Sequence, residues 1–181
     1  SPIDVSALLQ EKLFEKTETV VLTSATLSTN GKFNFIKDRL GLETEKTETL
    51  LAPSSFNYEK QAIIYIPKAM PDPRAPEFTE IIKLLNITNG RAFVLSTSNF
   101  GMNALYELVS MRVNYPCFVQ GSMSKTGLLE RFRKTPNAVL FATASFWQGV
   151  DVRGEQLSCV IIDKLPFAVP TDPIVAARTK F

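Results

Sequence analysis

Short apolar runs alternate with amphipathic stretches of helical length over the second half of the chain, and this alternation constrains the fold more than any other feature. The apolar runs lie at residues 91–95, 116–120, 138–142 and 157–162, and the amphipathic stretches lie at residues 77–88, 99–113 and 125–134. Buried strands that alternate with helices of this length are typical of βαβ units and a mostly parallel sheet. The sequence therefore predicts an α/β fold.

Local signals mark the ends of several elements. Ser124 is suited to cap the helix at 125–134, and Asn89-Gly90 is suited to end the helix at 77–88. Nearer the amino end we expect a helix over 4–18 with Asp4 as its N-cap, a turn at Asn30-Gly31, and a short helix that Gly41 closes. Two more apolar runs, at 19–23 and 61–66, predict strands, and four prolines between 67 and 76 predict an extended loop.

Composition excludes several classes of site. The 181 residues include no histidine and two cysteines, so the chain holds neither a Ser/His/Asp triad nor a four-cysteine iron–sulfur site. No apolar run approaches the ~18 residues that cross a membrane, and free buried thiols suit the cytoplasm. The net charge of +2 gives no general attraction to nucleic acid, so any DNA contact must use local donors.

Ten residues between the last two apolar runs have the character of a binding loop. Residues 145–154 read Ser-Phe-Trp-Gln-Gly-Val-Asp-Val-Arg-Gly. Ligands of open α/β sheets bind at the carboxyl ends of strands, which is where this loop begins. Gly149 and Gly154 allow the backbone to turn or to approach a partner closely, and Asp151 adds a carboxylate. We therefore expect a functional site here.

Two further segments join this loop in a recognisable order. Residues 23–27 read Thr-Ser-Ala-Thr-Leu, and residues 163–173 read Asp-Lys-Leu-Pro-Phe-Ala-Val-Pro-Thr-Asp-Pro. Together with the loop, they resemble motif III, motif V and the segment after motif V in the superfamily 2 DNA helicases related to XPD and DinG, in the bacterial DinG-like branch. The resemblance implies a RecA-like domain, with three α/β/α layers and a mostly parallel sheet.

The resemblance also implies how the chain is divided. Residues 1–27 correspond to the end of a first helicase motor domain, and residues 28–181 correspond to a second motor domain that stops before the family's last motif. Gly31-Lys32 lacks the upstream glycine of a phosphate-binding loop, and the chain has no Asp-Glu pair to hold magnesium. We therefore expect a fragment of an ATP-dependent DNA helicase of 5′–3′ polarity, from DNA repair or replication, that does not hydrolyse ATP alone.

The resemblance assigns two groups of residues to the backbone of single-stranded DNA. They are Ser96, Thr97 and Ser98, which look like motif IV, and Thr143, Ser145 and Phe146, which belong to the motif V turn. Hydroxyls and amides at the start of a helix are suited to a phosphate group, although plain capping of the helix explains Ser98 as well. Trp147 offers a surface for base stacking, but we interpret it as a core anchor.

A second set of residues faces, by resemblance, the ATP cleft between two motor domains. These residues are Thr23, Ser24, Thr26, Gln148, Gly149 and Asp151. An ordinary turn explains Ser24 and Thr26, and capping of a turn explains Asp151 nearly as well. We expect Thr97, Ser145 and Asp151 to lie along a single rim, and we interpret the basic residues of the helix at 125–134 as a solvated face.

The expected ligands and partners follow from the same resemblance. The full-length protein uses ATP and Mg²⁺, whereas we expect none bound to this fragment, and an iron–sulfur cluster, if present, lies outside the chain. The partners are single-stranded DNA and the missing first motor domain, with no membrane. A stand-alone nucleic-acid-binding or interaction module that has a RecA-like fold but no motor activity is the alternative.

Overall fold

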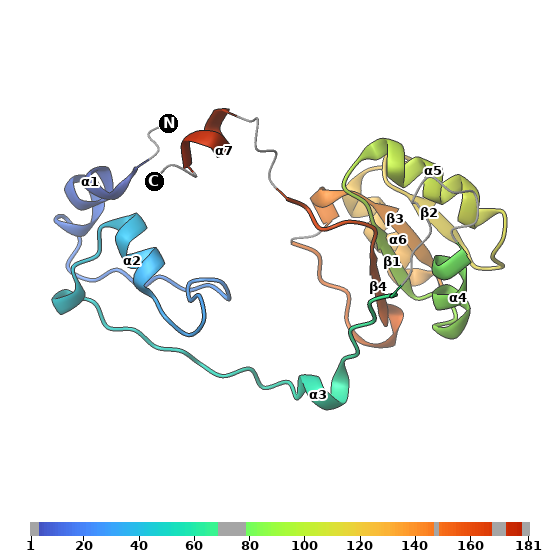
Figure 1. The fold of residues 1–181 in the computed structure, drawn as a ribbon, viewed down its shortest axis with the longest axis horizontal. Coiled ribbons are helices and arrows are strands. Elements are labelled where there is room, and N and C mark those ends of the chain that lie inside the picture. The colour runs from blue at the N-terminus through green and yellow to red at the C-terminus, as the bar shows by residue number, and fades with distance from the viewer. Residues whose placement is uncertain (1–3, 69–78, 147–148, 168–172, 179–181) are drawn as a thin grey trace. The chain divides into compact units, whose positions relative to one another are not determined.

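The computed structural model describes residues 4–68, 79–146, 149–167 and 173–178 (Figure 1). The chain divides into two units: residues 66–167, called the sheet unit below, and residues 1–65 with 168–181, called the terminal unit. The expected domain boundary after residue 27 falls within the terminal unit and stays a prediction.

Four parallel strands form the centre of the sheet unit. They are β1 (Ala92–Leu95), β2 (Cys117–Val119), β3 (Val139–Ala142) and β4 (Cys159–Ile162). The strand order is β2-β3-β1-β4, so that β1 pairs with both β3 and β4. β1 and β3 are buried along their whole length, as expected for strands whose sequence is continuously apolar.

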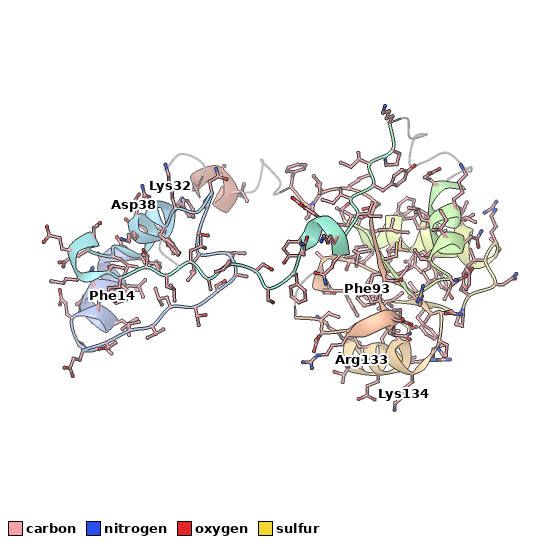
Figure 2. All side chains as sticks on the ribbon, turned by 90° about the horizontal axis from the view of Figure 1, so that it is seen from below. Phe14, Lys32, Asp38, Phe93, Arg133 and Lys134 are labelled. Carbon is pink, nitrogen blue, oxygen red and sulfur yellow. The ribbon has the colours of Figure 1, made fainter. Side chains whose placement is uncertain are left out.

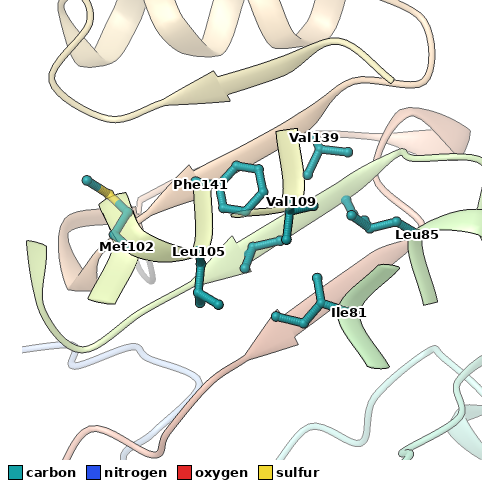
Figure 3. Close-up of a cluster of buried hydrophobic side chains, with 9 residues drawn as sticks. Ile81, Leu85, Met102, Leu105, Val109, Val139 and Phe141 are labelled. Carbon is teal, nitrogen blue, oxygen red and sulfur yellow. The ribbon is translucent and has the colours of Figure 1, made fainter. Parts of the chain in front are cut away.

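Helices cover both faces of this sheet. On one face, α4 (Thr79–Ile87) and α5 (Asn99–Ser110) contribute Ile81, Leu85, Met102, Leu105 and Val109 to a core cluster with the strands (Figure 3). On the other face, α6 (Lys125–Lys134) contributes Leu128, Leu129 and Phe132 to a second core cluster. The result is the α/β/α layering of a RecA-like fold, which confirms the predicted fold class.

The predicted end signals in the sheet unit act as expected. Ser124 Oγ accepts a hydrogen bond of 3.2 Å from the Gly127 amide, at the start of α6. Gly90 has φ +70°, and a Cβ on it would lie 2.1 Å from the Asn137 carbonyl oxygen. Only glycine fits this position, because a side chain there would meet both left-handed strain and main-chain atoms.

The terminal unit consists of short helical segments. They are α1 (Ser6–Leu9), the π-helical η1 (Gln10–Phe14), α2 (Asn34–Leu40), η2 (Thr44–Lys46), α3 (Tyr58–Gln61) and α7 (Pro173–Arg178). The helix expected over 4–18 is shorter, because α1 begins at Ser6 and η1 ends at Phe14. Its N-cap position is Val5 rather than the predicted Asp4, although Asp4 Oδ1 accepts from the Ser6 amide at 2.8 Å. The Asn30-Gly31 turn and the Gly41 helix end are confirmed, since both glycines have positive φ and residues 29 and 32 pair.

The two strands predicted nearer the amino end are wrong. Residues 19–23 and 62–66 belong to no strand, and Val21 and Ile63 are 81% and 95% exposed. A strand requires a neighbouring strand to complete its backbone hydrogen bonds, and neither segment has one among the described residues. Most of the predicted proline-rich loop lies outside the described residues. Within the described parts of the chain, no helix combines the length and the apolar character that crossing a membrane requires.

Candidate functional site

Polar residues follow all four strands directly, at the carboxyl edge of the sheet. In sheet order they are Gln120, Thr143, Ser96 and Asp163. Leu95 at the end of β1 is paired with Ala142 on β3 and with Ile162 on β4, so the residues that follow these three strands are level with one another. The sheet thus ends in one polar row, which is the edge where open α/β sheets bind ligands.

Gln120 fixes the turn after β3. Its Oε1 accepts from the Thr143 amide at 2.8 Å and from Thr143 Oγ1 at 3.1 Å. Since Thr143 is the first residue of that turn, one side chain from the neighbouring strand sets both the main chain and the side chain there. The sequence analysis missed Gln120, because the strand predicted over 116–120 included it, whereas β2 ends at Val119.

Ser96 and Asp163 lie next to each other on the α5 side of the same row. Ser96 is fully buried, and neither its Oγ nor Asp163 Oδ1 has a hydrogen-bond partner among the described residues. The other carboxylate oxygen, Oδ2, is 3.7 Å from the point where a Cβ on Gly101 would lie, in the first turn of α5. A carboxylate is stabilised at this positive end of a helix. Asp163 is the second residue of the row that sequence reasoning missed.

Thr97 and Ser98 are exposed where β1 leads into α5. Ser98 Oγ accepts from the Gly101 amide at 3.1 Å, so the capping interpretation of Ser98 is confirmed. Phe100 follows in the first turn and is 86% exposed. Exposed hydroxyls and an exposed aromatic ring therefore gather at the start of α5.

The turn after β3 contains the 3₁₀ segment η3 (Ala144–Phe146). Ser145 is exposed, whereas Phe146 is buried in the second core cluster. Phe146, like Ser96, has no side-chain surface to offer to a strand of DNA in this structure. Trp147 and Gln148 lie outside the described residues, so their predicted roles stay predictions.

Asp151 lies beside the last turn of α6. Its carbonyl accepts from Arg133 Nη2 at 2.5 Å, and its Oδ2 is paired with Arg153 Nε at 3.1 Å. A pocket of about 350 Å³ is lined by Arg133, Asp151, Val152, Arg153 and Gln156. The Asp151 carboxylate is 69% exposed, so it stays accessible from solvent. Gly149, two residues earlier, is exposed and has φ +67°.

The expectation that Thr97, Ser145 and Asp151 share one rim is wrong for Asp151. A helix that connects two parallel strands runs antiparallel to them, so α6 begins near the carboxyl edge of the sheet and ends near the amino edge. Lys125, its first residue, contacts Ser145, whereas Arg133, in its last turn, contacts Asp151. Thr97 and Ser145 therefore share the carboxyl edge, and Asp151 lies at the other end of α6.

Thr23, Ser24 and Thr26 belong to the terminal unit, and all three are exposed. Ser24 Oγ lies 3.1 Å from Thr26 Oγ1 and accepts from the Thr26 amide at 3.2 Å. This is the ordinary turn that was the alternative to a role in the cleft.

Cys117 and Cys159 are free, as expected, but they are half-buried rather than buried. Burial raises the pKa of the Cys117 thiol to about 11 and also raises the pKa of Cys159. Both thiols are therefore protonated and weakly nucleophilic at neutral pH. Across the described ranges, no cluster of three or more His, Cys, Asp or Glu residues is placed to hold a metal ion.

Comparison with known proteins adds independent evidence. The family model described as "Helicase C-terminal domain" matches residues 81–181. The chain is 40% identical over 183 residues to the ATP-dependent DNA helicase YoaA of Escherichia coli, with 98% of this chain and 28% of that protein covered. It is 36% identical to the ATP-dependent helicase DinG of Mycobacterium tuberculosis, with 99% and 28% covered. It is 31% identical to the 3′–5′ exonuclease DinG of Bacillus subtilis, with 98% and 20% covered. The chain thus spans between 20% and 28% of the length of these relatives.

Proposed function

The chain belongs to the family of helicase C-terminal domains, and from this premise we propose that it is the second motor domain of an ATP-dependent DNA helicase. The relatives named as ATP-dependent helicases support this assignment. We extend the proposal to 5′–3′ polarity and to a role in DNA repair or replication. A cytoplasmic location is part of the same proposal, and the two free cysteines support it because disulfides are rare there.

The observation that carries the proposal is the carboxyl edge of the sheet. Thr97, Ser98 and Ser145 present hydroxyls there on two neighbouring turns, and α5 begins at the same edge. Such groups bind phosphates through hydroxyls and main-chain amides without reading base sequence. We propose that single-stranded DNA lies along this edge, with Thr143 behind the exposed hydroxyls as a support.

Phe100 extends this proposed DNA path. Its ring is almost fully exposed in the first turn of α5, two residues after Ser98. Exposed aromatic rings beside a phosphate-binding edge stack on bases whatever their sequence. Phe100 thereby replaces Phe146 as the proposed aromatic contact, since Phe146 is buried.

The loop at Gly149 and Asp151 forms, in our proposal, one wall of the ATP cleft. Gln148 belongs to the same wall, and Thr23, Ser24 and Thr26 belong to the first motor domain that completes it. The accessible carboxylate of Asp151 and the guanidinium group of Arg153 offer polar contacts to a nucleotide or its magnesium-bound water. ATP with Mg²⁺, when bound, supplies the free energy for movement along DNA.

Single-strand binding by the full-length protein tests the proposal. We expect Thr97→Ala combined with Ser145→Ala to weaken binding of an oligo-dT strand about tenfold, because two phosphate contacts of about 0.5–1.5 kcal/mol each are lost. The expected control is Ser110→Ala, at the opposite end of α5, with an unchanged Kd. Binding should also weaken steeply with salt. An unchanged Kd in the double variant would remove these residues from the DNA path.

A stand-alone module without motor activity is the other candidate. ATP hydrolysis separates the two, because a module of that kind would bind DNA with no ATPase activity in the full-length protein. Two of the relatives are named ATP-dependent helicases, which favours the motor.

A further inference from the structure

The first residue of α6 contacts the start of the segment that follows β3, which is the stretch from Ser145 to Gln156. Lys125 Nζ donates a hydrogen bond to the Ser145 carbonyl oxygen and lies 5.1 Å from the centroid of the Phe146 ring. A cation over an aromatic face is attracted by the ring quadrupole. Lys125 is thus fixed by two contacts on η3, and the turn that exposes Ser145 is held to the start of α6.

The last turn of α6 contacts the same segment further along. Arg133 Nη2 donates to the Asp151 carbonyl oxygen, while Gln156 Nε2 donates to the carbonyl oxygens of Phe132 and Thr135 at 2.8 Å and 2.7 Å. Arg133 and Lys134 project from this turn in Figure 2. The basic residues of α6 are therefore not a uniform solvated face, because two of them bind main-chain carbonyl groups of one segment.

The spacing between these two contacts is set by the helix. Lys125 and Arg133 are eight residues apart in sequence, which corresponds to about 12 Å along a helix axis. Leu128, Leu129 and Phe132 anchor α6 in the second core cluster, so the helix does not shift easily against the sheet. Both ends of the segment are consequently tied to one rigid element.

We propose that Lys125 and Arg133 are positioning residues that make the Ser145 turn and the Asp151 turn move as one body. This inference rests on the proposed function, in which the first turn contacts DNA and the second faces the nucleotide. Binding of DNA at one end of α6 is then transmitted to the other end, through a rigid element rather than through the loop itself. Both residues act on carbonyl groups, so neither touches the strand or the nucleotide.

The test measures ATP hydrolysis by the full-length protein with and without saturating oligo-dT. The variants Lys125→Met and Arg133→Met remove the donors and keep much of the side-chain volume. We expect each to lower the ratio of DNA-stimulated to DNA-free rate about tenfold. The matched control is Lys134→Met on the same turn, because the Lys134 side chain makes no hydrogen bond, ion pair or ring contact in the described part of the chain. The ratio of this variant should stay within about twofold of wild type.

The double variant separates coupling from simple damage. If α6 transmits the signal only when both ends are tied, Lys125→Met combined with Arg133→Met lowers the ratio no further than either single change. Two independent structural losses at this separation would instead multiply, to about a hundredfold. A multiplied loss, or an unchanged ratio in either single variant, overturns the inference. If the methionine variants do not fold, Lys125→Gln and Arg133→Gln take their place, with the same expected and contradicting results.

Failure of the proposed function would look different. A wild-type protein that neither hydrolyses ATP nor binds oligo-dT contradicts the helicase assignment itself. A wild-type protein whose ATPase responds to DNA, and responds equally in all variants, contradicts only the role of α6.

Discussion

The sheet unit and the terminal unit both contain apolar runs, but only the sheet unit buries them in a core. Every buried apolar side chain that the structure describes lies between Ile81 and Phe146, in the sheet unit. In the described part of the terminal unit no residue is buried, although it contains apolar runs such as residues 19–23 and 62–65. The difference shows that an apolar strand sequence gives a core only where neighbouring strands and helices are present to cover it.

The largest effect that tests this difference is expected in the core. Phe141 is fully buried on β3, with its ring 5.6 Å from that of Tyr106. We expect Phe141→Ala to lower the free energy of unfolding of the sheet unit by about 3–5 kcal/mol, because it removes apolar burial and leaves a cavity. Urea unfolding followed through alkylation of Cys117 and Cys159 reports on this unit alone, since both cysteines lie in its sheet.

The matched change in the terminal unit is Phe35→Ala in α2. Phe35 is 61% exposed and contacts Arg39 at 5.5 Å. We expect Phe35→Ala to alter the free energy of unfolding of the sheet unit by less than about 0.5 kcal/mol. Equal losses for the two phenylalanines would contradict the distinction between the units.

A smaller effect is expected from two glycines with positive φ. Gly90→Ala should cost more than about 2 kcal/mol, because it adds left-handed strain to a clash with the Asn137 carbonyl. Gly31→Ala, in the terminal unit, meets only Leu51 at 3.9 Å, so the sheet unit should keep its stability. The same urea and alkylation measurement compares the two variants. An unchanged stability of Gly90→Ala would show that the main chain at Asn137 moves away from the added methyl group at little cost.

The smallest effect concerns two helix caps of the same chemistry. Ser124→Ala removes the cap of α6 and should cost about 1 kcal/mol of sheet-unit stability. Asn57 Oδ1 accepts from the Lys60 amide at 3.3 Å at the start of α3, a helix of four residues. Asn57→Ala should leave the sheet unit unchanged, while amide hydrogen exchange of residues 58–61 becomes faster. A loss of sheet-unit stability in Asn57→Ala would show that the stabilities of the two units are coupled.

Much of the sheet unit was predictable because its local signals agree with its tertiary structure. The bounds of α6 match the prediction, and β1, β3 and β4 fall within the predicted apolar runs. The same signals failed at residues 19–23 and 61–66. Strand propensity describes how a residue fits a pleated, half-buried surface, and it does not say whether that surface exists.

The candidate site was predictable to the extent that strand ends define it. Thr97 and Ser145 were assigned through the family resemblance, and both lie just after predicted strands. Asp163 also follows a predicted strand directly, whereas the run predicted at 116–120 included Gln120 and so concealed it. The burial of Ser96 and Phe146 depends on what packs over them, which spacing does not reveal. The two contacts of α6 were missed because a basic helix gives no sign of the carbonyl groups that lie beside it.

The strand order has a consequence for how the chain assembles during synthesis. β1 leaves the ribosome first, yet its two partners, β3 and β4, are both made later than β2, which does not pair with it. Nascent β1 and β2 therefore have no strand to pair with until β3, residues 139–142, emerges and pairs with both. Assembly of the sheet is a late, non-local event, and a chain interrupted before residue 139 carries two unpaired apolar segments that are prone to aggregate.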